Sequence, residues 1–452
     1  MSFEITDILL EEIKVHIRNE DDTVLLELFE DVHHADVAEI LDEVNWDEAL
    51  YLLRLLDSET TSEALMELDD DVRERLLDSL TPKEIAEEIE EMDTDDAVDA
   101  IAELDSAIQE AVIEQIEDEE HKADIREMLQ YDEDSAGGLM AKELIRVKET
   151  WTVAGCVREM RRQAEEVTRV HSIYVVTKED VLIGRLSLKD LLTSDTKTKI
   201  SEIYIPKVDS VHVHDDGEDV AKLMQKYDLE AIPVVDDEKK LLGRITIDDI
   251  VDFIRDEAKE DYQLAAGITQ EVEADDSIIE LTRARLPWLF LGLIGGVGAA
   301  TIMGGFEDIL EDYALLFFYT PLIAAMAGNV GVQSSAIIVQ GLANDDVKGS
   351  ISNRLLKEMA LAALNGLLLG LALFAFTALW YRNEPDSLHT ALAISISLFA
   401  VIIMAGIIGT FIPLFLNKRG IDPAIATGPF ITTSNDIFGI LIYFWIAKLI
   451  LF

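Results

Sequence analysis

The sequence contains few of the residues that many functional sites require. Its single cysteine, Cys156, excludes an internal disulfide and a cysteine metal cluster, and we interpret it as a small buried hydrophobic residue. Basic residues number 37 against 90 acidic ones, and no basic patch is present, which argues against nucleic-acid binding. The sequence shows no nucleophile–base pair and no phosphate-binding loop, so we do not predict an enzyme.

The acidic charge is distributed unevenly along the chain. Residues 1–286 hold 79 acids and 30 bases, whereas residues 287–452 hold 11 acids and 7 bases. This imbalance excludes a single uniform soluble domain. The N-terminal residues MSFEITDILL lack a basic region and a long apolar run, so we predict no signal peptide and expect the soluble part in the cytoplasm.

Five long apolar stretches follow Arg285, and each approaches or exceeds the roughly 20 residues that a membrane-spanning helix needs. They predict five transmembrane helices, because five consecutive long apolar segments would be unusual in a soluble core. The stretches are Leu286–Phe306, Ala314–Ala343, Leu355–Tyr381, Leu388–Leu416 and Pro423–Phe452.

Basic residues near the ends of these stretches predict the orientation in the membrane. They precede the first span, separate the second from the third and separate the fourth from the fifth: Arg283, Arg285, Lys348, Arg354, Lys357, Lys418 and Arg419. The other two loops hold one base, Arg382. A cytoplasmic N-terminus therefore predicts an external C-terminus in the plasma (inner) membrane.

Residues 1–130 predict an all-α domain. Segments such as 36–44, 62–68, 83–92 and 96–104 each place Ala, Ile and Leu on one helical face, which favours a superhelical stack of short helices. The domain holds 44 acids and 8 bases. Most of these acids are explained by a solvated surface, with adaptation to a high-salt host as one reading, and a smaller share is available for cations.

Residues 137–257 contain a duplication, and we place the module that it forms at 131–247. SIYVVTKEDVLIGRLSLKDLL (172–192) matches AIPVVDDEKKLLGRITIDDIV (231–251) at a constant offset, and each copy predicts strand, turn, strand and helix. This α/β unit resembles a tandem pair of cystathionine-β-synthase (CBS) domains. Some such pairs bind adenine nucleotides, with the acid of a Ser/Thr-x-x-Asp motif on the ribose, which here implies Asp190 and Asp249. A helix-capping role explains these two residues equally well.

Residues 248–280 predict a connecting helix with a surplus of acids before the first span. Asp249, Asp252, Asp256 and Glu260 recur at helical spacing, and Glu257 pairs with Asp261. Like charges one turn apart repel, so water or a cation must separate them. The position of this helix favours divalent-ion sensing over a merely solvated face.

Residues 281–452 form the predicted transmembrane domain, and its polar residues suggest an ion path. Asp436 lies in GPFITTSNDIFG (428–439) without a basic partner nearby, beside Thr432 and Asn435. Asn329 and Gln333 share one helical face, and Gly428 before Pro429 exposes backbone carbonyls. Oxygen ligands favour a hard cation such as Mg²⁺, although Ca²⁺, Mn²⁺ and Na⁺ fit the same ligands. Helix packing for the amides, and a structural or proton-carrying Asp436, are the alternatives.

Taken together, these segments resemble the MgtE family of magnesium transporters. The resemblance covers nearly the whole chain, and its most specific stretches are GNVGVQS (328–334) and DPAIATGPFITTSNDIFGILIYF (422–444). It implies a homodimeric Mg²⁺-selective channel with Asp436 in the pore and a plug helix at 248–266. It also implies regulatory Mg²⁺ sites on acids of the soluble domains, the plug helix and the membrane edge: Asp95, Asp99, Glu218, Asp228, Asp249, Asp252, Glu257, Glu260, Asp261 and Asp422.

Two other functions compete with this channel. One is a secondary transporter driven by protons or Na⁺ through Asp436, and the other is a membrane sensor that transports nothing. We favour a channel for magnesium uptake that is gated by intracellular Mg²⁺ at acidic interfaces between the domains. A buried carboxylate and an amide face inside the spans make little sense in a passive anchor.

Overall fold

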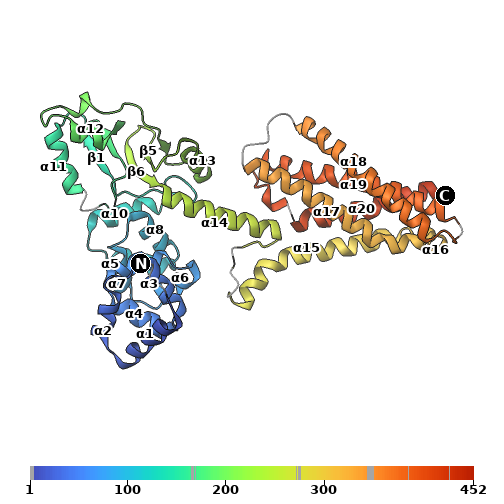
Figure 1. The fold of residues 1–452 in the computed structure, drawn as a ribbon, viewed down its shortest axis with the longest axis horizontal. Helices are drawn as coiled ribbons and strands as arrows, with labels where there is room; N and C mark the ends of the chain where they lie inside the picture. The colour runs from blue at the N-terminus through green and yellow to red at the C-terminus, as the bar shows by residue number, and fades with distance from the viewer. Residues whose placement is uncertain are drawn as a thin grey trace. The chain divides into compact units, whose positions relative to one another are not determined.

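The computed structural model describes residues 5–163, 167, 169–270, 272, 276–343, 351–384, 386–426 and 428–452. The chain divides into two compact units, Met1–Ile254 and Arg255–Phe452, which are described separately below (Figure 1). Lys348, one of the basic residues used to predict the orientation, lies outside the described residues.

Among its described residues, the first unit begins with ten short helices, in agreement with the predicted all-α domain. Asn45 with Glu48, and Thr81 with Glu84, form capping boxes that fix where two of these helices begin. Alternate helices pack together, α3 on α5, α5 on α7 and α7 on α9, so the segment is a superhelical stack (Figure 1). The helices are α1 (Asp7–Asn19), α2 (Asp22–Phe29), α3 (His34–Glu43), α4 (Trp46–Leu55), α5 (Ser58–Met66), α6 (Asp70–Leu77), α7 (Pro82–Ile89), α8 (Thr94–Ala102), α9 (Ser106–Ile113) and α10 (Glu119–Met128).

Two three-stranded sheets follow, and they have the same topology. In each sheet the middle strand pairs in parallel with the strand before it and antiparallel with the strand after it. The first copy contains β1 (Ile145–Lys148), α11 (Val153–Gln163), β2 (Ile173–Val176), β3 (Leu182–Leu186) and α12 (Leu188–Thr193). The second contains β4 (Val211–His212), α13 (Gly217–Tyr227), β5 (Ala231–Val235), β6 (Leu241–Thr246) and α14 (Ile247–Ala266), with the turn η1 (Ile200–Glu202) between the copies.

The strand register confirms the predicted duplication. Val175 pairs with Gly184 in the first sheet, and Val234 pairs with Gly243 in the second. Each middle strand also shifts register directly after that pair. The copies differ at their ends, because α12 has 6 residues whereas α14 has 20.

In the described part of the second unit, five helices are long and apolar enough to cross a membrane, which confirms the predicted spans. They are α15 (Ile278–Gly304), α17 (Leu315–Ala343), α18 (Ile351–Trp380), α19 (Ser387–Asn417) and α20 (Gly428–Leu451). The short helices α16 (Glu307–Asp312) and η2 (Ala424–Ala426) lie between them in the sequence. A capping box of Ser277 and Glu280 starts α15 before its apolar stretch begins.

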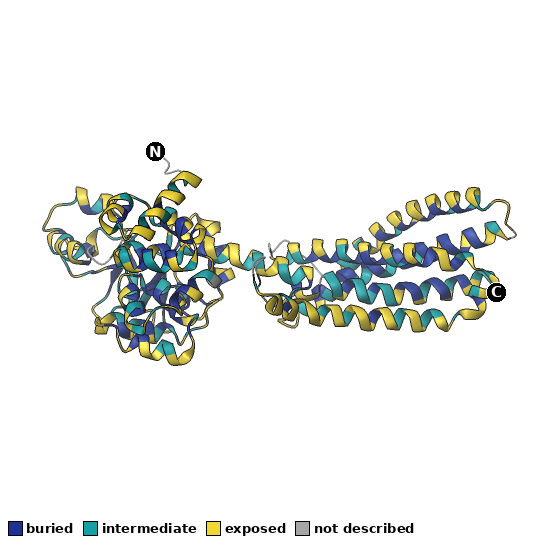
Figure 2. Cartoon of the chain, turned by 90° about the horizontal axis from the view of Figure 1, so that it is seen from below, coloured by how far each residue is buried: buried dark blue, intermediate teal, exposed yellow. Residues whose placement is uncertain are grey.

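Helix α19 forms the centre of this unit. It packs against α17, α18 and α20, and it carries more buried residues than any other described span. Helix α15 packs mainly on α20, and few of its residues are buried. Figure 2 shows long exposed faces on these helices, as expected for surfaces that contact lipid or another protein chain.

Candidate functional site

The predicted ion-path residues of α20 occupy its first three turns. Gly428 begins the helix, and its carbonyl oxygen accepts a hydrogen bond from Thr432 Oγ1 at 2.8 Å. Asp436 follows one turn later and is half-buried. This arrangement places a backbone carbonyl, a hydroxyl and a carboxylate at successive turns of one membrane helix.

Helix α17 approaches α20 at two glycines. A Cβ built on Gly328 would lie 3.2 Å from Thr432 Cγ2 and 3.8 Å from Asp436 Oδ1. A Cβ on Gly331 would lie 1.8 Å from Asn435 Nδ2, so that position leaves no room for a side chain. The glycines of GNVGVQS therefore bring the backbone of α17 against the polar residues of α20.

Asn435 is fully buried at this contact. Within the described part of the chain, neither its Oδ1 nor its Nδ2 has a hydrogen-bond partner. A buried amide without partners is costly, above all in a membrane. Water reaching the helix contact would satisfy both atoms, whereas a cation would satisfy Oδ1 alone.

Asn329 and Gln333 lie on a different face of α17. Both side chains are exposed in the single chain, whereas the neighbouring Gly328 and Gly331 are buried. The structure thus places the two amides on one face, as predicted, but not against α20 of the same chain.

The end of α14 meets the start of α20. A Cβ on Gly428, whose φ is +38°, would lie 2.0 Å from the carbonyl oxygen of Ala265. A Cβ on Gly267, whose φ is +82°, would lie 2.3 Å from Pro429 Cγ. Only glycine fits either position, so the connecting helix ends directly on the first turn of the pore-candidate helix. Asp422, nearby in sequence, is exposed and accepts a hydrogen bond from the Ala424 amide at 2.8 Å.

Three carboxylates converge in the first unit. Asp93, Asp95 and Glu143 each offer an oxygen, and these oxygens lie within 4.8 Å of one another. Glu143 Oε2 also accepts hydrogen bonds from the Thr94 amide at 3.2 Å and from Thr94 Oγ1 at 2.8 Å. This group, the α8 cluster, joins the start of α8 to the segment before β1. Its carboxylate oxygens suit a hard divalent cation.

The α8 cluster has too little positive charge to balance it. Burial raises the pKa of Asp93 to about 6, and burial together with the charge of Asp96 raises the pKa of Asp95 well above its ordinary value. The carboxylate of Asp249 also raises both pKa values, so α14 contributes to the same negative field. Arg244 Nη2 lies 3.5 Å from Asp93 Oδ2. Two ionised carboxylates whose oxygens lie within 4.8 Å of each other, as in this cluster, repel by about 3 kcal/mol at an effective dielectric constant of 20.

Sequence reasoning predicted Asp95 and Asp249 in this region but missed Asp93 and Glu143. Asp93 directly precedes α8, and an acid at that position reads as a helix cap. Glu143 comes shortly after YDEDSAGGLM, in a segment that carries no motif. Nothing in the sequence indicates that Glu143 returns to α8.

The other predicted regulatory residues lie outside the α8 cluster. Asp99 is exposed on α8, one turn after Asp95. Glu218 accepts a bond from Lys222 on its own helix at 2.6 Å, and Asp228 ends α13 in a left-handed conformation. The remaining four lie along α14: Asp252, Glu257, Glu260 and Asp261.

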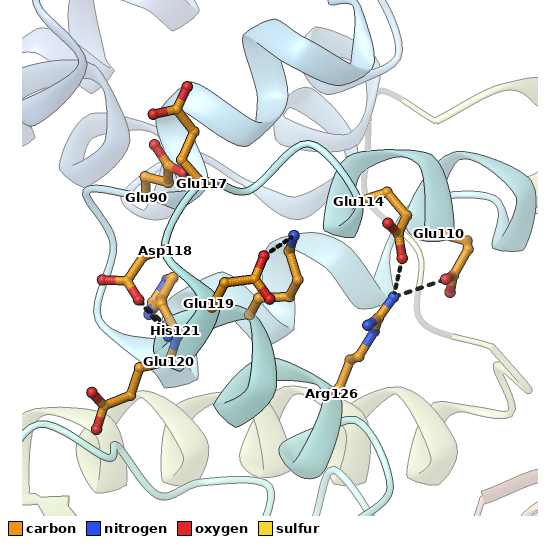
Figure 3. Close-up of polar contacts among 10 residues, drawn as sticks. Glu90, Glu110, Glu114, Glu117, Asp118, Glu119, Glu120, His121 and Arg126 are labelled. Carbon is orange, nitrogen blue, oxygen red and sulfur yellow. Dashed lines mark hydrogen bonds and ion pairs between the residues drawn. The ribbon is translucent and has the colours of Figure 1, made fainter.

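The acids around the start of α10 have different partners (Figure 3). Arg126 Nη2 donates to Glu110 at 2.9 Å and to Glu114 at 2.6 Å, and Lys122 lies 3.2 Å from Glu119. Asp118 caps α10 by accepting from the amides of Glu120 and His121. These carboxylates are satisfied locally, which supports the interpretation of most surface acids as solvated or paired.

The two CBS acids are not equivalent. Asp249 Oδ2 accepts hydrogen bonds from the amide and the hydroxyl of Thr246, as in a helix cap. In the first copy Ser187, which precedes α12, makes no such capping bond, and Asp190 is half-buried. The capping interpretation therefore describes Asp249 better than Asp190.

Comparison with known proteins follows these features along the chain. Residues 320–446 match the family model of the MgtE divalent cation transporter, and residues 32–134 match the MgtE intracellular N domain. Residues 136–196 and 200–256 match the CBS domain. Together these matches cover the helical stack, both sheets and most of the spans.

Two relatives are named magnesium transporter MgtE. The protein of Enterococcus faecalis is 37% identical over 327 residues, which are 72% of this chain and 71% of that one. The protein of Thermus thermophilus is 36% identical over 333 residues, which are 73% of each chain. Both names describe transporters rather than enzymes, in agreement with the prediction from the sequence.

Two solved structures resemble the first unit. The soluble part of a magnesium transporter has a TM-score of 0.51 and 30% identity, covering 55% of this chain and 98% of that one. The cytosolic domain of the Mg²⁺ channel MgtE in complex with ATP has a TM-score of 0.51 and 34% identity, covering 54% and 99%.

The fold and the matched domains define a multi-pass membrane protein with a helical N-domain and a CBS pair. Identity over most of the chain then fixes the family. The chain belongs to the MgtE family of magnesium transporters.

Proposed function

We propose that this protein conducts Mg²⁺ across the membrane along a path at α17 and α20. The single observation that carries the proposal is the contact of the two helices. There Asp436 and the amide of Asn435, which has no partner among the described residues, face the glycines of α17. Mg²⁺ keeps much of its water shell. Carbonyl, hydroxyl, amide and carboxylate oxygens can therefore accept hydrogen bonds from its bound water as well as bind the ion directly.

Uptake of Mg²⁺ into vesicles that contain the purified protein tests this function. We expect Asp436→Ala to lower the initial uptake rate by at least about tenfold, because the carboxylate attracts the divalent ion inside a low-dielectric region. Equal uptake by both proteins would remove Asp436 from the path. Uptake that requires a proton or Na⁺ gradient would favour the secondary transporter instead.

We further propose that intracellular Mg²⁺ closes this path through the soluble domains. The α8 cluster supports the proposal, because a divalent ion would neutralise carboxylates that otherwise repel across the boundary between α8 and the CBS segment. The acids of the connecting helix α14 would also repel one another and would also be neutralised by a divalent ion: Asp249, Asp252, Glu257, Glu260 and Asp261. At low Mg²⁺ the repulsion shifts the population to an open state.

The glycine contact between α14 and α20 supplies the coupling in this scheme. Because Gly428 meets the Ala265 carbonyl without spare room, displacement of the connecting helix must alter the first turn of α20. We expect Gly428→Ala to weaken the inhibition of uptake by Mg²⁺ on the cytoplasmic side. Inhibition at the wild-type Mg²⁺ concentration would argue against this coupling.

A homodimer with the ion path at its two-fold axis is part of the proposal. The exposed amides of Asn329 and Gln333 support it, because amides facing lipid are costly and a second copy would cover them. A cysteine at position 333, in a chain with Cys156→Ala, tests the arrangement by disulfide cross-linking in membranes. Efficient cross-linking supports the dimer, and transport by an isolated monomer would contradict it.

We also propose that the CBS pair binds an adenine nucleotide, as the ATP complex of the related cytosolic domain suggests. Asp190 is the better candidate for the ribose, because Thr246 already engages Asp249. Titration with ATP tests this assignment, and Asp190→Asn is expected to weaken binding more than Asp249→Asn does.

The predicted topology and the boundaries of the modules complete the proposal. We place the C-terminus outside the cell, because the basic residues gather in the loops on the other side. We take 1–130, 131–247, 248–280 and 281–452 as the functional modules. Labelling of a cysteine placed after Phe452 in intact cells tests the external C-terminus.

A further inference from the structure

One carboxylate of the membrane helices has no role in the function proposed above. Beyond their first turns, the five spans contain two acidic residues, Asp436 in α20 and Glu358 in α18. Glu358 begins the third turn of α18, and its side chain is half-buried. A carboxylate in such a segment is costly and is kept only with a partner or a function.

Its partner is the neighbouring helix α17. Ser334 Oγ donates a hydrogen bond to Glu358 Oε1 at 2.6 Å, and Ser334 is 5% exposed. This distance lies within the range of a well-formed hydrogen bond from a hydroxyl to a carboxylate oxygen. The pair therefore ties α18 to one side of α17.

The same carboxylate also contacts the central helix α19. A Cβ on Gly406 would lie 3.3 Å from Glu358 Oε1 and 3.3 Å from Ala362 Cβ. A glycine at this position leaves space for the carboxylate between the helices. Glu358 thus occupies a junction of α17, α18 and α19.

Tight contacts lie one turn before Ser334 on α17. A Cβ on Gly409 of α19 would lie 2.3 Å from the Gly331 carbonyl oxygen, and Gly331 in turn meets Asn435 of α20. Neither contact has spare room, so the rotation of α17 about its axis decides how Asn435 and the adjacent Asp436 are held.

We propose that Glu358 is a positioning residue for the ion path, which it serves by fixing the rotation of α17 through Ser334. The proposal rests on the proposed function of Asp436. Glu358 does not itself contact the ion, because its carboxylate is directed to Ser334 and Gly406. What it controls is the geometry of the site to which the ion binds.

The test is Mg²⁺ uptake by vesicles containing the full-length protein, measured over a range of Mg²⁺ concentrations. We expect Glu358→Ala and Ser334→Ala each to raise the half-saturating Mg²⁺ concentration by about fivefold, the loss expected for one hydrogen bond. The double variant is expected to match the single ones, because both substitutions remove the same bond. Glu358→Gln keeps an oxygen that accepts from Ser334 and is expected to stay near wild type.

Met359→Ala serves as the control, because Met359 is the next residue of α18 and is 41% exposed. Thermal unfolding of each variant, measured in detergent, separates lost stability from altered half-saturation. If Glu358→Ala is not recovered from membranes, Ser334→Ala carries the test alone.

An unchanged half-saturating concentration in Ser334→Ala, or additive effects in the double variant, would overturn the proposal. Impaired uptake by Glu358→Gln beside normal uptake by Ser334→Ala would also overturn it, because the charge and not the hydrogen bond would then matter. Asp436→Ala is measured in parallel. If it transports normally, the proposed function fails, whatever Glu358 does.

Discussion

Two acidic regions of the first unit have similar composition and different surroundings. In the α8 cluster three carboxylates converge within 4.8 Å, and Arg244 is the cationic partner of Asp93. Around α10 the carboxylates spread outward and bind Arg126, Lys122 or the helix amides (Figure 3). The comparison teaches that the number of acids does not identify a cation site. A group of acids that converges and is partly buried is the better candidate for one.

The largest expected effect is the loss of the Mg²⁺ response when the α8 cluster is neutralised. In wild type, millimolar Mg²⁺ is expected to slow proteolysis of the soluble domains by about tenfold, because neutralised carboxylates allow these domains to pack. Asp93→Asn with Asp95→Asn removes both the repulsion and the ligands, so the rate should no longer depend on Mg²⁺. Limited proteolysis of the full-length protein in detergent measures this change.

The matched variant neutralises two acids near α10, Glu117→Gln with Glu120→Gln. It changes the net charge by the same amount but leaves the α8 cluster intact, so the Mg²⁺ response should stay within about twofold of wild type. If both double variants lose the response equally, overall charge and not convergence governs it. The α8 cluster and the acids near α10 would then not differ in their response to Mg²⁺.

A smaller effect concerns Glu88, a buried acid that lies outside the α8 cluster. It is 8% exposed and accepts a hydrogen bond from Thr61 Oγ1 at 2.6 Å, and burial raises its pKa to about 7. The folded chain therefore holds a proton that the unfolded chain releases above about pH 4.5. Stability from this group is complete below that pH and is lost as the pH rises towards 7.

The change amounts to about 3 kcal/mol at most for this shift. Glu88→Gln should flatten this part of the pH dependence, which thermal unfolding at pH 5 and pH 8 measures. Glu39→Gln, at an exposed position of α3, is the control. An unaltered difference between the two pH values in Glu88→Gln would exclude burial of this carboxyl as the cause.

The smallest expected effect concerns Asp118, the residue that caps α10. Asp118→Ala removes a helix cap, so it should lower the free energy of unfolding by about 1 kcal/mol. The proteolysis response to Mg²⁺ should not change, because Asp118 is structural. Denaturant unfolding measures the first quantity, and a lost Mg²⁺ response would assign this acid to a cation site after all.

Much of the fold was predictable because its patterns are local or repeated. The offset of the two CBS copies anticipates the pairing of Val175 with Gly184 and of Val234 with Gly243. The five apolar stretches identify the spans, but the start of α15 depends on the capping box at Ser277, which hydropathy does not detect.

The candidate sites were predictable only in part, for a physical reason. Asp436 is conspicuous because a carboxylate in an apolar stretch needs an explanation. Glu143 is not, because 49 residues separate it from Thr94, to which it bonds, and only the tertiary fold brings them together. Glu358 was also missed, since the role that we propose for it depends on Ser334 of another helix.

The shortness of helices α1–α10 has a consequence for how the N-terminal stack unfolds. Each has 8 to 13 residues, and helices of this length scarcely persist alone in water. Each helix is therefore stabilised mainly by packing against its neighbours. Amide hydrogens along the whole stack should exchange with solvent at similar rates, and deleting one interior helix should unravel the rest.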